Sequence, residues 1–438
     1  MTVESMLHNS IPLPKSYDSI TTYTDDFLEY VKTAQFYKTF GVGEIHILDL
    51  FTTNSYEQTV PNEWREYFGS DLFSFETFLA FVVHNGDCDE AMPFSLNETL
   101  LRIKRLSFNR ECTEMLPTKS LQKIGESPKK LHETDNFSFY ISKLAKQLEI
   151  KNVVDFGSGA GFLVRGLAFG YGLSAVGLER RQTLIRHSEK LDKIHSRQIH
   201  NTRKVDIRHI QQEIDGTDLS DVLKDYKNCL AVSIHSCGDL TWHALSALSQ
   251  PSFKAVAIVG CCYNSMKIFP YSKKLSPCTM STTAKMIACQ APQNWTKETS
   301  ENFFKRHFYR ALLQRLMADM GLLREEKRLL VGSLRSPCFE SFAKYTRAGM
   351  GKLDMESNVT EEAVRLAPRY EESYASRFMH VKILWTLICA CSALLESCIL
   401  LDRYYFMMEQ PQVAGAQIIN VFDQTISPRN MAVVAWKF

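Results

Sequence analysis

The chain has 438 residues, of which 45% are hydrophobic and 23% are charged. This composition is ordinary for globular proteins, so it excludes collagen, a coiled coil, global disorder and a small disulfide-stapled scaffold, and at ~150 residues per domain it allows two or three compact units. Residues 1–100 carry 16 acidic and 4 basic side chains although the net charge is +2, so residues 101–438 carry an excess of positive charge. This positive part either faces a phosphate-bearing partner or packs near the acidic N-terminal part.

The N-terminal part of the chain has helical periodicity. Residues 1–20 are polar and predict a loose arm. Between residues 22 and 86, apolar side chains recur at spacings of three and four, and their aromatic members are expected to form core rather than a binding surface. A further helical region, about 95–116, leads onward. We therefore expect an N-terminal helical region over residues 1–120.

After about residue 130, helical stretches alternate with short β-branched runs. Such runs are typical of strands that are buried on both faces. The alternation therefore predicts a parallel sheet covered by helices on both sides. The predicted strands lie at 153–156, 175–179, 230–235 and 255–259.

The C-terminal part contains a long predicted helix, about 300–320, and two further apolar runs. If 329–332 is the sixth strand and Met431–Trp436 is an antiparallel last strand, the residues at about 335–425 form a helical insertion at the carboxyl edge of the sheet. There the insertion would act as a wall or lid over a bound acceptor. Arg429 and Asn430 would point toward the same rim.

Membrane association is not expected, because a spanning helix needs ~20 apolar residues and the longest apolar stretch, 383–395, suits a buried helix better. Residues 1–14 lack the basic region and apolar core of a secretory signal. The twelve cysteines include no CxxC pair, which indicates thiols in a reducing compartment. We therefore expect a cytoplasmic or nuclear protein.

The strongest chemical signal is a D-x-G-x-G-x-G pattern that begins at Asp155, after a strand and before a helix. Glycine is needed where the chain turns tightly and a ligand approaches the backbone, and the helix beyond presents N–H groups to that ligand. Glu179, at the end of the next strand, is placed to accept both hydroxyl hydrogens of a ribose. The pattern predicts binding residues at Asp155, Phe156, Gly157, Ser158, Gly159, Gly161 and Glu179.

Two cofactors compete for this turn. A dinucleotide pattern that starts at Gly157 requires glycine at position 162, where Phe162 stands. An acidic residue on the strand instead suits S-adenosylmethionine, which has no pyrophosphate to seat. A glycine-rich turn without a ligand is the alternative. Asp206, expected at the end of the third strand, would accept from the adenine amino group or else be a solvated loop residue.

Two cysteine-containing segments follow successive predicted strands, H-S-C-G-D-L-T from His235 and G-C-C-Y-N from Gly260. The carboxyl ends of neighbouring parallel strands form the ligand cleft of such sheets. We therefore expect their side chains to converge beside the donor methyl group, and we take four as candidate catalytic residues. The converging residues are His235, Cys237, Cys261, Cys262, Tyr263 and Asn264, and the catalytic candidates are His235, Cys237, Asp239 and Cys262.

Three interpretations of these segments stay open. Their residues could pack beneath the cofactor. They could position or deprotonate the methyl acceptor, with His235 and Asp239 as the titratable groups. They could bind zinc, which ranks last because two adjacent cysteines suit one tetrahedral site poorly. No metal is therefore expected.

From about residue 64 onward, the chain resembles the methyltransferase-like protein 25 family, which includes a relative named for a ribosomal RNA adenine dimethylase domain. The resemblance implies a class I S-adenosylmethionine-dependent methyltransferase: an α/β, Rossmann-like fold with a mostly parallel seven-stranded sheet over residues 121–438, an N-terminal helical region and a helical insertion before the last strand. Its segments are S-P-K-K-L-H-E from Ser127, the turn at 155–161, the segments at 235–241 and 260–264, L-L-D-R from Leu400 and S-P-R-N from Ser427.

The segment that starts at Ser127 is expected to place Lys130 and Glu133 toward the cofactor, although a methionine usually precedes it where this chain has Glu126. Lys130 could also be an ordinary solvated lysine. The H-x-C-G and C-C elements resemble a transfer-RNA 2′-O-methyltransferase family as well, which points toward RNA. The N/D-P-P-Y/F segment that grips planar amines is missing, so adenine dimethylation is not supported.

Residues 180–209 hold nine Lys/Arg against three Glu/Asp. Such a surface could track a phosphate backbone, although it lacks aromatic residues for base stacking and a basic run is often just a solvated helix face. We expect a methyltransferase that uses S-adenosylmethionine and acts on a macromolecular acceptor, with RNA ahead of protein. The alternatives are a protein methyltransferase and a non-catalytic scaffold that binds the same cofactor, while Phe162 argues against a nicotinamide oxidoreductase.

Overall fold

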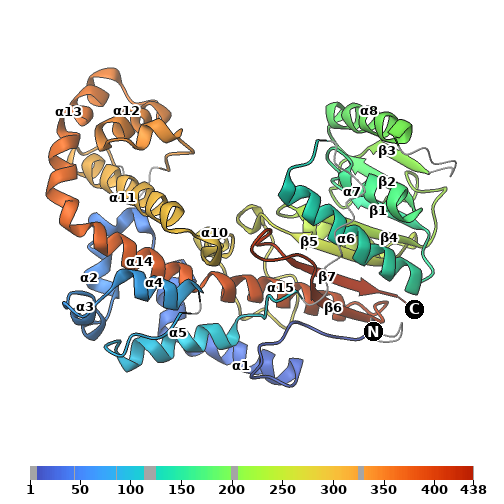
Figure 1. The fold of residues 1–438 in the computed structure, drawn as a ribbon, viewed down its shortest axis with the longest axis horizontal. Helices are drawn as coiled ribbons and strands as arrows, with labels where there is room; N and C mark the ends of the chain where they lie inside the picture. Colours follow the sequence, from blue (N-terminus) through green and yellow to red (C-terminus); the bar gives the residue numbers. More distant parts are fainter. Residues whose placement is uncertain are drawn as a thin grey trace. The chain divides into compact units, whose positions relative to one another are not determined.

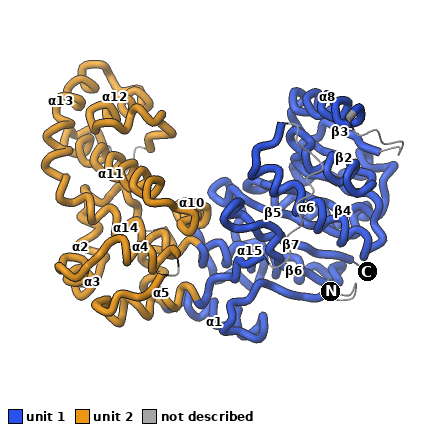
Figure 2. Tube along the Cα trace, viewed as in Figure 1, with its two compact units in different colours: residues 1–33, 105–280, 393–438 blue, residues 34–104, 281–392 orange. Residues whose placement is uncertain are grey.

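The computed structural model describes residues 7–43, 45–84, 86–112, 125–198, 206–323 and 330–437. The chain forms two compact units, shown in different colours in Figure 2. Unit 1 comprises residues 1–33, 105–280 and 393–438, and unit 2 comprises residues 34–104 and 281–392. Each unit is therefore assembled from segments that lie far apart in the sequence.

A seven-stranded sheet forms the centre of unit 1 (Figure 1). Its strand order is β3-β2-β1-β4-β5-β7-β6, with β1 to β5 parallel and β7 antiparallel to both of its neighbours. This arrangement confirms the expected Rossmann-like class I methyltransferase fold. The strands are β1 (Asn152–Phe156), β2 (Ser174–Glu179), β3 (Ile207–Gln211), β4 (Cys229–Ser236), β5 (Phe253–Gly260), β6 (Gly415–Asn420) and β7 (Met431–Trp436).

Helices cover the sheet of unit 1 because its strands are apolar on both faces. On one face, alternate residues such as Val153 and Leu230 pack with Phe137 and Ile141 of α6 in one core. The helix α9 contacts β4 and β5, and α8 contacts β2 and β3. The helical elements of unit 1 are α1 (Ile20–Thr33), α6 (Pro128–Gln147), α7 (Phe162–Arg165), the π-helical turn Gly166–Gly170, α8 (Gln182–Gln198), α9 (Leu240–Ser246), the 3₁₀ turns Ala247–Ser249 and Tyr263–Ser265, and most of α15 (Ser392–Met408).

The regular elements of unit 2 are all helical within the residues that the structure describes. Aromatic residues that were predicted to form core lie inside it: Phe78 is fully buried, and Phe75 meets Phe304 edge to face with 5.5 Å between ring centroids. The unit contains η2 (Tyr37–Gly41), η3 (Ile47–Phe51), α2 (Ser55–Thr59), α3 (Asn62–Phe68), α4 (Phe75–His84), most of α5 (Phe94–Leu106), α10 (Thr282–Ala288), η7 (Pro292–Asn294), α11 (Lys297–Asp319), η8 (Ser336–Phe339), α12 (Phe342–Lys352), α13 (Ser357–Tyr374), η9 (Ala375–Arg377) and α14 (Phe378–Ala390).

The predicted sixth strand at 329–332 is wrong. Leu330, Val331 and Gly332 form no strand, and Leu329 lies outside the described residues. The position beside β7 is taken by β6, which forms antiparallel hydrogen bonds with β7 along its length. The bounds of the predicted helical insertion, 335–425, also differ from the structure. Residues 281–392 belong to unit 2, and the predicted insertion includes the strand β6.

The N-terminal segment also differs from the predicted arrangement. The structure groups residues 34–104 with 281–392 rather than treating 1–120 as one region. The described part of the predicted loose arm joins the sheet edge, because Ser10 bridges to Gln417 and the side chain of Asn9 accepts from the amide of Ala416 at 3.0 Å. Edge strands leave backbone groups unpaired, and this segment covers some of those of β6.

A continuous helical run at 357–408 is the one described segment long and apolar enough to pass a length-and-composition test for a membrane span. Of its most apolar 18-residue window, 89% is buried within the protein. Burial of this extent is what a core helix shows, as the sequence predicted for 383–395. The run is therefore weak evidence for a membrane span.

Candidate functional site

The turn after β1 has the conformation that its glycines allow. Gly157, Gly159 and Gly161 all adopt positive φ, at 71°, 57° and 70°, a region that other residues rarely enter. A Cβ at Gly161 would lie 2.7 Å from Cε1 of His209, so a larger residue there has no room. The turn leads directly into α7, and the amides of Gly157 and Ser158 donate to the carbonyl of Leu178 at 2.9 and 3.0 Å.

Glu179 ends β2 and binds the same turn. One carboxylate oxygen accepts from the amide of Gly159 at 3.1 Å, and the other accepts from the amide of Arg181 at 3.0 Å. The residue is 6% exposed. Its carboxylate is therefore held at the edge of the glycine turn rather than released into solvent.

A cavity of about 170 Å³ lies against the turn within unit 1. The cavity brings together most of the predicted cofactor-binding residues with four residues that the sequence argument missed. The predicted members are Lys130, Glu133, Asp155, Gly157, Ser158, Gly159 and His235, and the missed members are Thr134, Phe162, Leu163 and Ile234. Thr134 had a usable signal, because it shares the face of one helix turn with Lys130 and Glu133.

Helix α6 begins in a way that places its first turn at this cavity. The Ser127 hydroxyl accepts from the amide of Lys130, and Pro128 occupies the first helical position, where a missing N–H costs nothing. The Lys130 ammonium lies 4.6 Å from the centre of the Phe162 ring, a cation–π distance. The S-P-K-K segment thus acts as a helix start that presents Lys130 to the cavity.

Asp155 places a buried carboxyl group in the wall of the cavity, with 4% of the residue exposed. Burial raises the pKa of Asp155 well above its ordinary value of 3.8, and nearby Glu179 adds to this while Lys130 opposes it. A cationic ligand group in the cavity would stabilise the charged form. The hydroxyl of Ser158 is also buried and has no hydrogen-bond partner, which leaves a polar position for a ligand.

His235 and Glu133 form the second polar part of the cavity. Nε2 of His235 lies 2.8 Å from one Glu133 oxygen, and the Ser427 hydroxyl donates to the other at 2.6 Å. Burial alone would raise the pKa of Glu133, but its hydrogen bonds with His235 and Ser427 lower it below its ordinary value. Ser427 was missed as a site residue, although it opens the S-P-R-N segment that carries the family resemblance.

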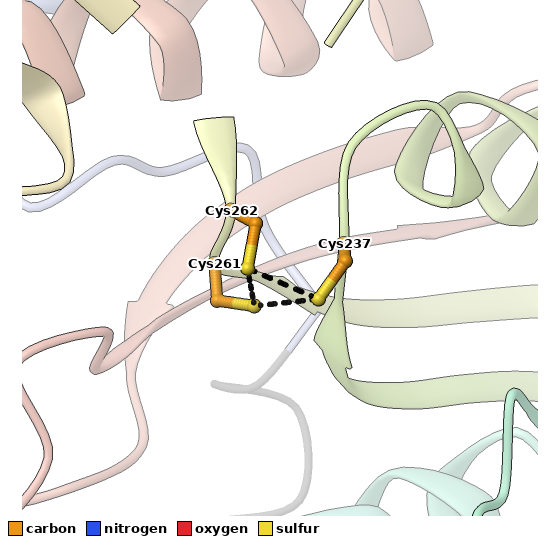
Figure 3. Close-up of side chains that lie close together, drawn as sticks. All are labelled: Cys237, Cys261 and Cys262. Carbon is orange, nitrogen blue, oxygen red and sulfur yellow. Dashed lines mark hydrogen bonds between the residues drawn. The ribbon is translucent and has the colours of Figure 1, made fainter. Parts of the chain in front are cut away.

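The thiols of Cys237, Cys261 and Cys262 lie close together (Figure 3). The Cys237 sulfur lies 3.2 Å from the sulfurs of Cys261 and Cys262, which are 3.4 Å from each other. The hydrogen bond with Cys261 is the main factor that lowers the pKa of Cys237 to about 6, and the same bond raises the pKa of Cys261. The structure therefore brings together the two cysteine segments that follow β4 and β5.

Tyr263 was expected beside the donor methyl group, and this is wrong. The residue is 1% exposed, and its hydroxyl donates to a Glu396 oxygen at 2.7 Å. Arg110 and Arg429 bind the same carboxylate, Arg429 at 2.6 Å. Burial alone would raise the pKa of Glu396, but Arg110 and Arg429 lower it. Tyr263 therefore belongs to a buried ionic cluster, which also contains the missed Glu396.

Arg429 and Asn430 were predicted to point to the rim of the site, and both are buried instead. Arg429 is 8% exposed and binds Glu396. Asn430 is fully buried, and its side-chain amide donates to the carbonyl of Arg110 at 2.9 Å. The S-P-R-N segment therefore anchors the strand β7 from inside unit 1.

Asp206 was expected at the end of the third strand, and this is wrong. It precedes β3, and its carboxylate accepts from the hydroxyl of Ser174, the first residue of β2, at 2.7 Å. Both strands start at this edge, which is opposite to the edge that carries the glycine turn. An adenine contact from Asp206 is therefore not available.

Three further predicted residues lie outside the cavity lining. Phe156 is buried and meets Phe253 edge to face with 5.7 Å between ring centroids. The Asp239 carboxylate accepts from the amide of Lys267 at 2.9 Å, so it holds the loop after β5. Asn264 is exposed in the same loop. The contacts of Phe156 and Asp239 are therefore structural ones in this part of unit 1.

The predicted basic stretch 180–209 is only partly a surface. Residues 199–205 lie outside the described residues, and His209 turns inward, where its ring nitrogen lies 2.8 Å from Asp192. His195 is 5% exposed. The exposed basic residues of α8 follow a spacing of four, three and four along the helix, which gathers them into one stripe. These residues are Arg186, Lys190, Lys193 and Arg197.

Solved structures with some resemblance to this chain include methyltransferases. The N-terminal domain of EvdMO1 with SAH bound is 13% identical, covers 37% of this chain and 64% of that one, and has a TM-score of 0.24. Coclaurine N-methyltransferase bound to N-methylheliamine and SAH is 10% identical, covers 94% and 98%, and has a TM-score of 0.25. With TM-scores this low, neither similarity carries an argument.

Sequence comparison is more informative. A family model described as a methyltransferase domain matches residues 129–268. Probable methyltransferase-like protein 25 of Mus musculus is 33% identical over 246 residues, and the Homo sapiens protein of that name is 30% identical over 244. Each alignment covers 50% of this chain and 39% of the relative, so the chain matches less than half the length of these proteins. The chain therefore contains a methyltransferase domain and is related to methyltransferase-like protein 25.

Proposed function

We propose that this chain is an S-adenosylmethionine-dependent methyltransferase that holds its donor at the turn after β1. The observation that carries the proposal is the convergence of Asp155, Lys130 and the turn glycines on one cavity within the methyltransferase domain. An intact turn of this kind argues against a scaffold that has lost its cofactor site.

The charges in the cavity match the amino-acid end of the donor. Asp155 can accept from the donor ammonium, and Lys130 can pair with the donor carboxylate. The cavity of about 170 Å³ is smaller than the ~300 Å³ at which pockets for drug-sized ligands begin, so it suits this end rather than the whole donor. Glu179, bonded to Gly159 beside the cavity, is then positioned for the ribose hydroxyls.

His235 is the group best placed to take a proton from the acceptor. Because Glu133 lies against Nε2 of His235, a neutral ring that donates there leaves Nδ1 as a proton acceptor. Glu133 fixes the orientation of the ring through this bond. The bound donor supplies an electrophilic methyl group on a sulfonium, and alignment of the acceptor with it provides most of the rate enhancement.

Isothermal titration calorimetry with S-adenosylmethionine and S-adenosylhomocysteine tests the donor site. We expect the wild-type chain to bind both and Glu179→Gln to bind about tenfold to a hundredfold more weakly, since a hydrogen bond to a charged group contributes ~1.5–3 kcal/mol. Glu213→Gln is the matched control, because the Glu213 side chain is 66% exposed and pairs with Arg180, which is also exposed. No measurable binding by a folded wild-type chain would contradict the proposal.

RNA is the acceptor that we propose. It is supported by the basic stripe on α8, formed by Arg186, Lys190, Lys193 and Arg197, whose spacing suits a phosphate backbone. Neutralising all four to Gln should weaken RNA binding and flatten its dependence on salt concentration. Arg365→Gln with Arg369→Gln, on the exposed face of α13 in unit 2, is the control. Transfer of labelled methyl to protein but not to RNA fractions would instead identify a protein acceptor.

A further inference from the structure

We propose that Cys237, Cys261 and Cys262 bind a zinc ion in a site with one open coordination position. All three sulfurs lie within 4.8 Å of one another and point toward a common centre (Figure 3). Cysteine sulfur is a preferred zinc ligand. Zinc binding by these thiols does not depend on the proposed methyl transfer.

The backbone is shaped to bring the three thiols together. The neighbouring parallel strands β4 and β5 deliver one segment each, and their register shifts between Ile234 and Ser236. At this irregularity, His235 adopts a φ of 60°, a strained value for a side-chain-bearing residue. Gly238 follows with a φ of 55°, and a Cβ there would lie 2.8 Å from the carbonyl oxygen of Ser265. Strain of this kind persists where surrounding structure enforces it, so Cys237 is held toward its partners.

The distances suit an ion after a small adjustment. Zinc–sulfur bonds of ~2.3 Å in a tetrahedral site place two sulfurs ~3.8 Å apart. The sulfurs here are 3.2 and 3.4 Å apart, so each pair needs to separate by about half an ångström. Rotation about the Cα–Cβ bonds provides a movement of this size. Adjacent cysteines are therefore no obstacle here, because their sulfurs already face the same point.

The donor set indicates a site that is open to a further ligand. Within the part of the chain that the structure describes, no fourth histidine, cysteine or carboxylate belongs to the cluster. Structural zinc sites have four protein ligands, whereas catalytic sites have three and keep one position for water or substrate. Cys237 is exposed, so that position is accessible from solvent.

The cluster lies next to the donor cavity. The Cys237 thiol donates to the carbonyl of His235 at 3.1 Å, and His235 lines the cavity. The role of the open coordination position rests on the proposed function: this position would hold the nucleophilic atom of the methyl acceptor. That atom gives its proton to Nδ1 of His235 when it binds zinc. It then forms a bond to the methyl carbon as the bond from this carbon to the donor sulfur breaks and the sulfur keeps the electron pair.

Metal analysis of the purified full chain tests the site. We expect about one zinc per chain after dialysis against a weak chelator, and none above background in Cys237→Ser or in Cys261→Ser with Cys262→Ser. Cys88→Ser and Cys338→Ser, both in unit 2, should retain the ion. Cobalt added to the wild-type chain should produce thiolate-to-metal charge-transfer absorption, which shows the thiolate ligands without any variant.

Two results would overturn the site. The first is wild-type zinc content no higher than that of the double variant, together with the absence of the cobalt absorption. The second is a disulfide between two of these cysteines in protein that was purified under reducing conditions. Such a bond requires two sulfurs to approach to ~2.05 Å, and those sulfurs could then no longer bind zinc as thiolates. Calorimetry with S-adenosylmethionine separates the zinc site from the proposed donor site. Cys237→Ser should bind S-adenosylmethionine as the wild type does. Failure of a zinc-loaded chain to bind S-adenosylmethionine would count against the donor site alone.

Discussion

The two units of the chain bury different kinds of charge. All five buried carboxylates of the described residues lie in unit 1, namely Glu133, Asp155, Glu179, Glu396 and Asp402. The buried Asp, Glu, Lys, Arg and His side chains that the structure describes in unit 2 are all bases, namely Lys285, His307 and Lys382, whereas unit 1 buries bases such as Arg403 together with its carboxylates. A buried carboxylate is costly unless partners or a ligand compensate it, so these groups mark where a polar site has been built.

The cavities of the two units show the same contrast. The cavity of unit 2 is the larger, at about 290 Å³, and apolar residues such as Leu313 and Ile388 form much of its wall. The cavity of unit 1 is smaller but adjoins Asp155, Lys130 and the glycine turn after β1. Size alone is therefore a poor guide to function in this chain. The combination of buried carboxylates with the glycine turn after β1 identifies the candidate site.

The largest effect should follow from breaking the buried ionic cluster of unit 1. Glu396→Ala removes the partner of Arg110, Arg429 and Tyr263, and uncompensated buried charges of this kind cost about 3–5 kcal/mol. Because the pKa of Glu396 lies below its ordinary value of 4.5, its contribution is present above that pH and is lost as pH falls through the folded-state pKa. Urea unfolding at neutral and acidic pH measures both effects. A loss below 1 kcal/mol at neutral pH would contradict this account.

A smaller loss should follow from enlarging the cavity of unit 2. Leu313 is 2% exposed and lines that cavity. Leu313→Ala should cost about 2–3 kcal/mol, at the lower end for such changes, because the side chain already faces empty space on one side. Donor affinity should be unchanged, since the donor cavity is lined entirely by unit 1 residues. A weakened donor affinity in this folded variant would show that the two units are coupled.

The sequence predicts those features of the two units that depend on neighbouring residues, and it misses those that depend on residues far apart in the chain. The buried strands β1, β2, β4 and β5 and the glycine turn were predicted, because each needs only a few consecutive residues of the right type. The third strand was expected to end at Asp206, whereas β3 begins just after that residue and is only partly buried. The strand β6 was missed because its short apolar run resembles the one at 329–332, and pairing with β7 alone distinguishes them. Unit 2 was missed because segments 34–104 and 281–392 pack together across a long sequence separation.

The candidate site follows the same rule. Asp155, Lys130 and Glu133 line one cavity, because each is fixed by an adjacent strand end or helix start, and Glu179 binds the turn beside it. Their roles toward a cofactor stay predictions. Tyr263 was misplaced because its partner, Glu396, is 133 residues away. The sequence shows where backbone elements end, but it does not show which distant side chain will neutralise a buried group.

A stabilising change is expected at the donor cavity. Asp155→Asn removes a carboxyl group whose pKa is raised by burial, and it should stabilise the ligand-free chain by about 0.5–2 kcal/mol at neutral pH, at the expense of donor binding. The folded state of the wild type holds a proton that the unfolded state has lost, so its stability falls as pH rises from 3.8 through the folded-state pKa. Thermal unfolding across this range should show a fall that the variant lacks. Equal pH profiles would contradict the assignment.

The smallest effect should come from removing a buried base of unit 2. The ammonium of Lys382 lies 2.6 Å from a Glu301 oxygen and 4.3 Å from the centre of the Phe75 ring. Lys382→Met keeps an unbranched stem of similar size against the rings, and it leaves the Glu301 side chain, which is 44% exposed, to be solvated by water. The free energy of unfolding should therefore change by about 1 kcal/mol or less. A loss as large as that of Glu396→Ala would erase the contrast, because it would show that unit 2 also depends on a buried ion pair.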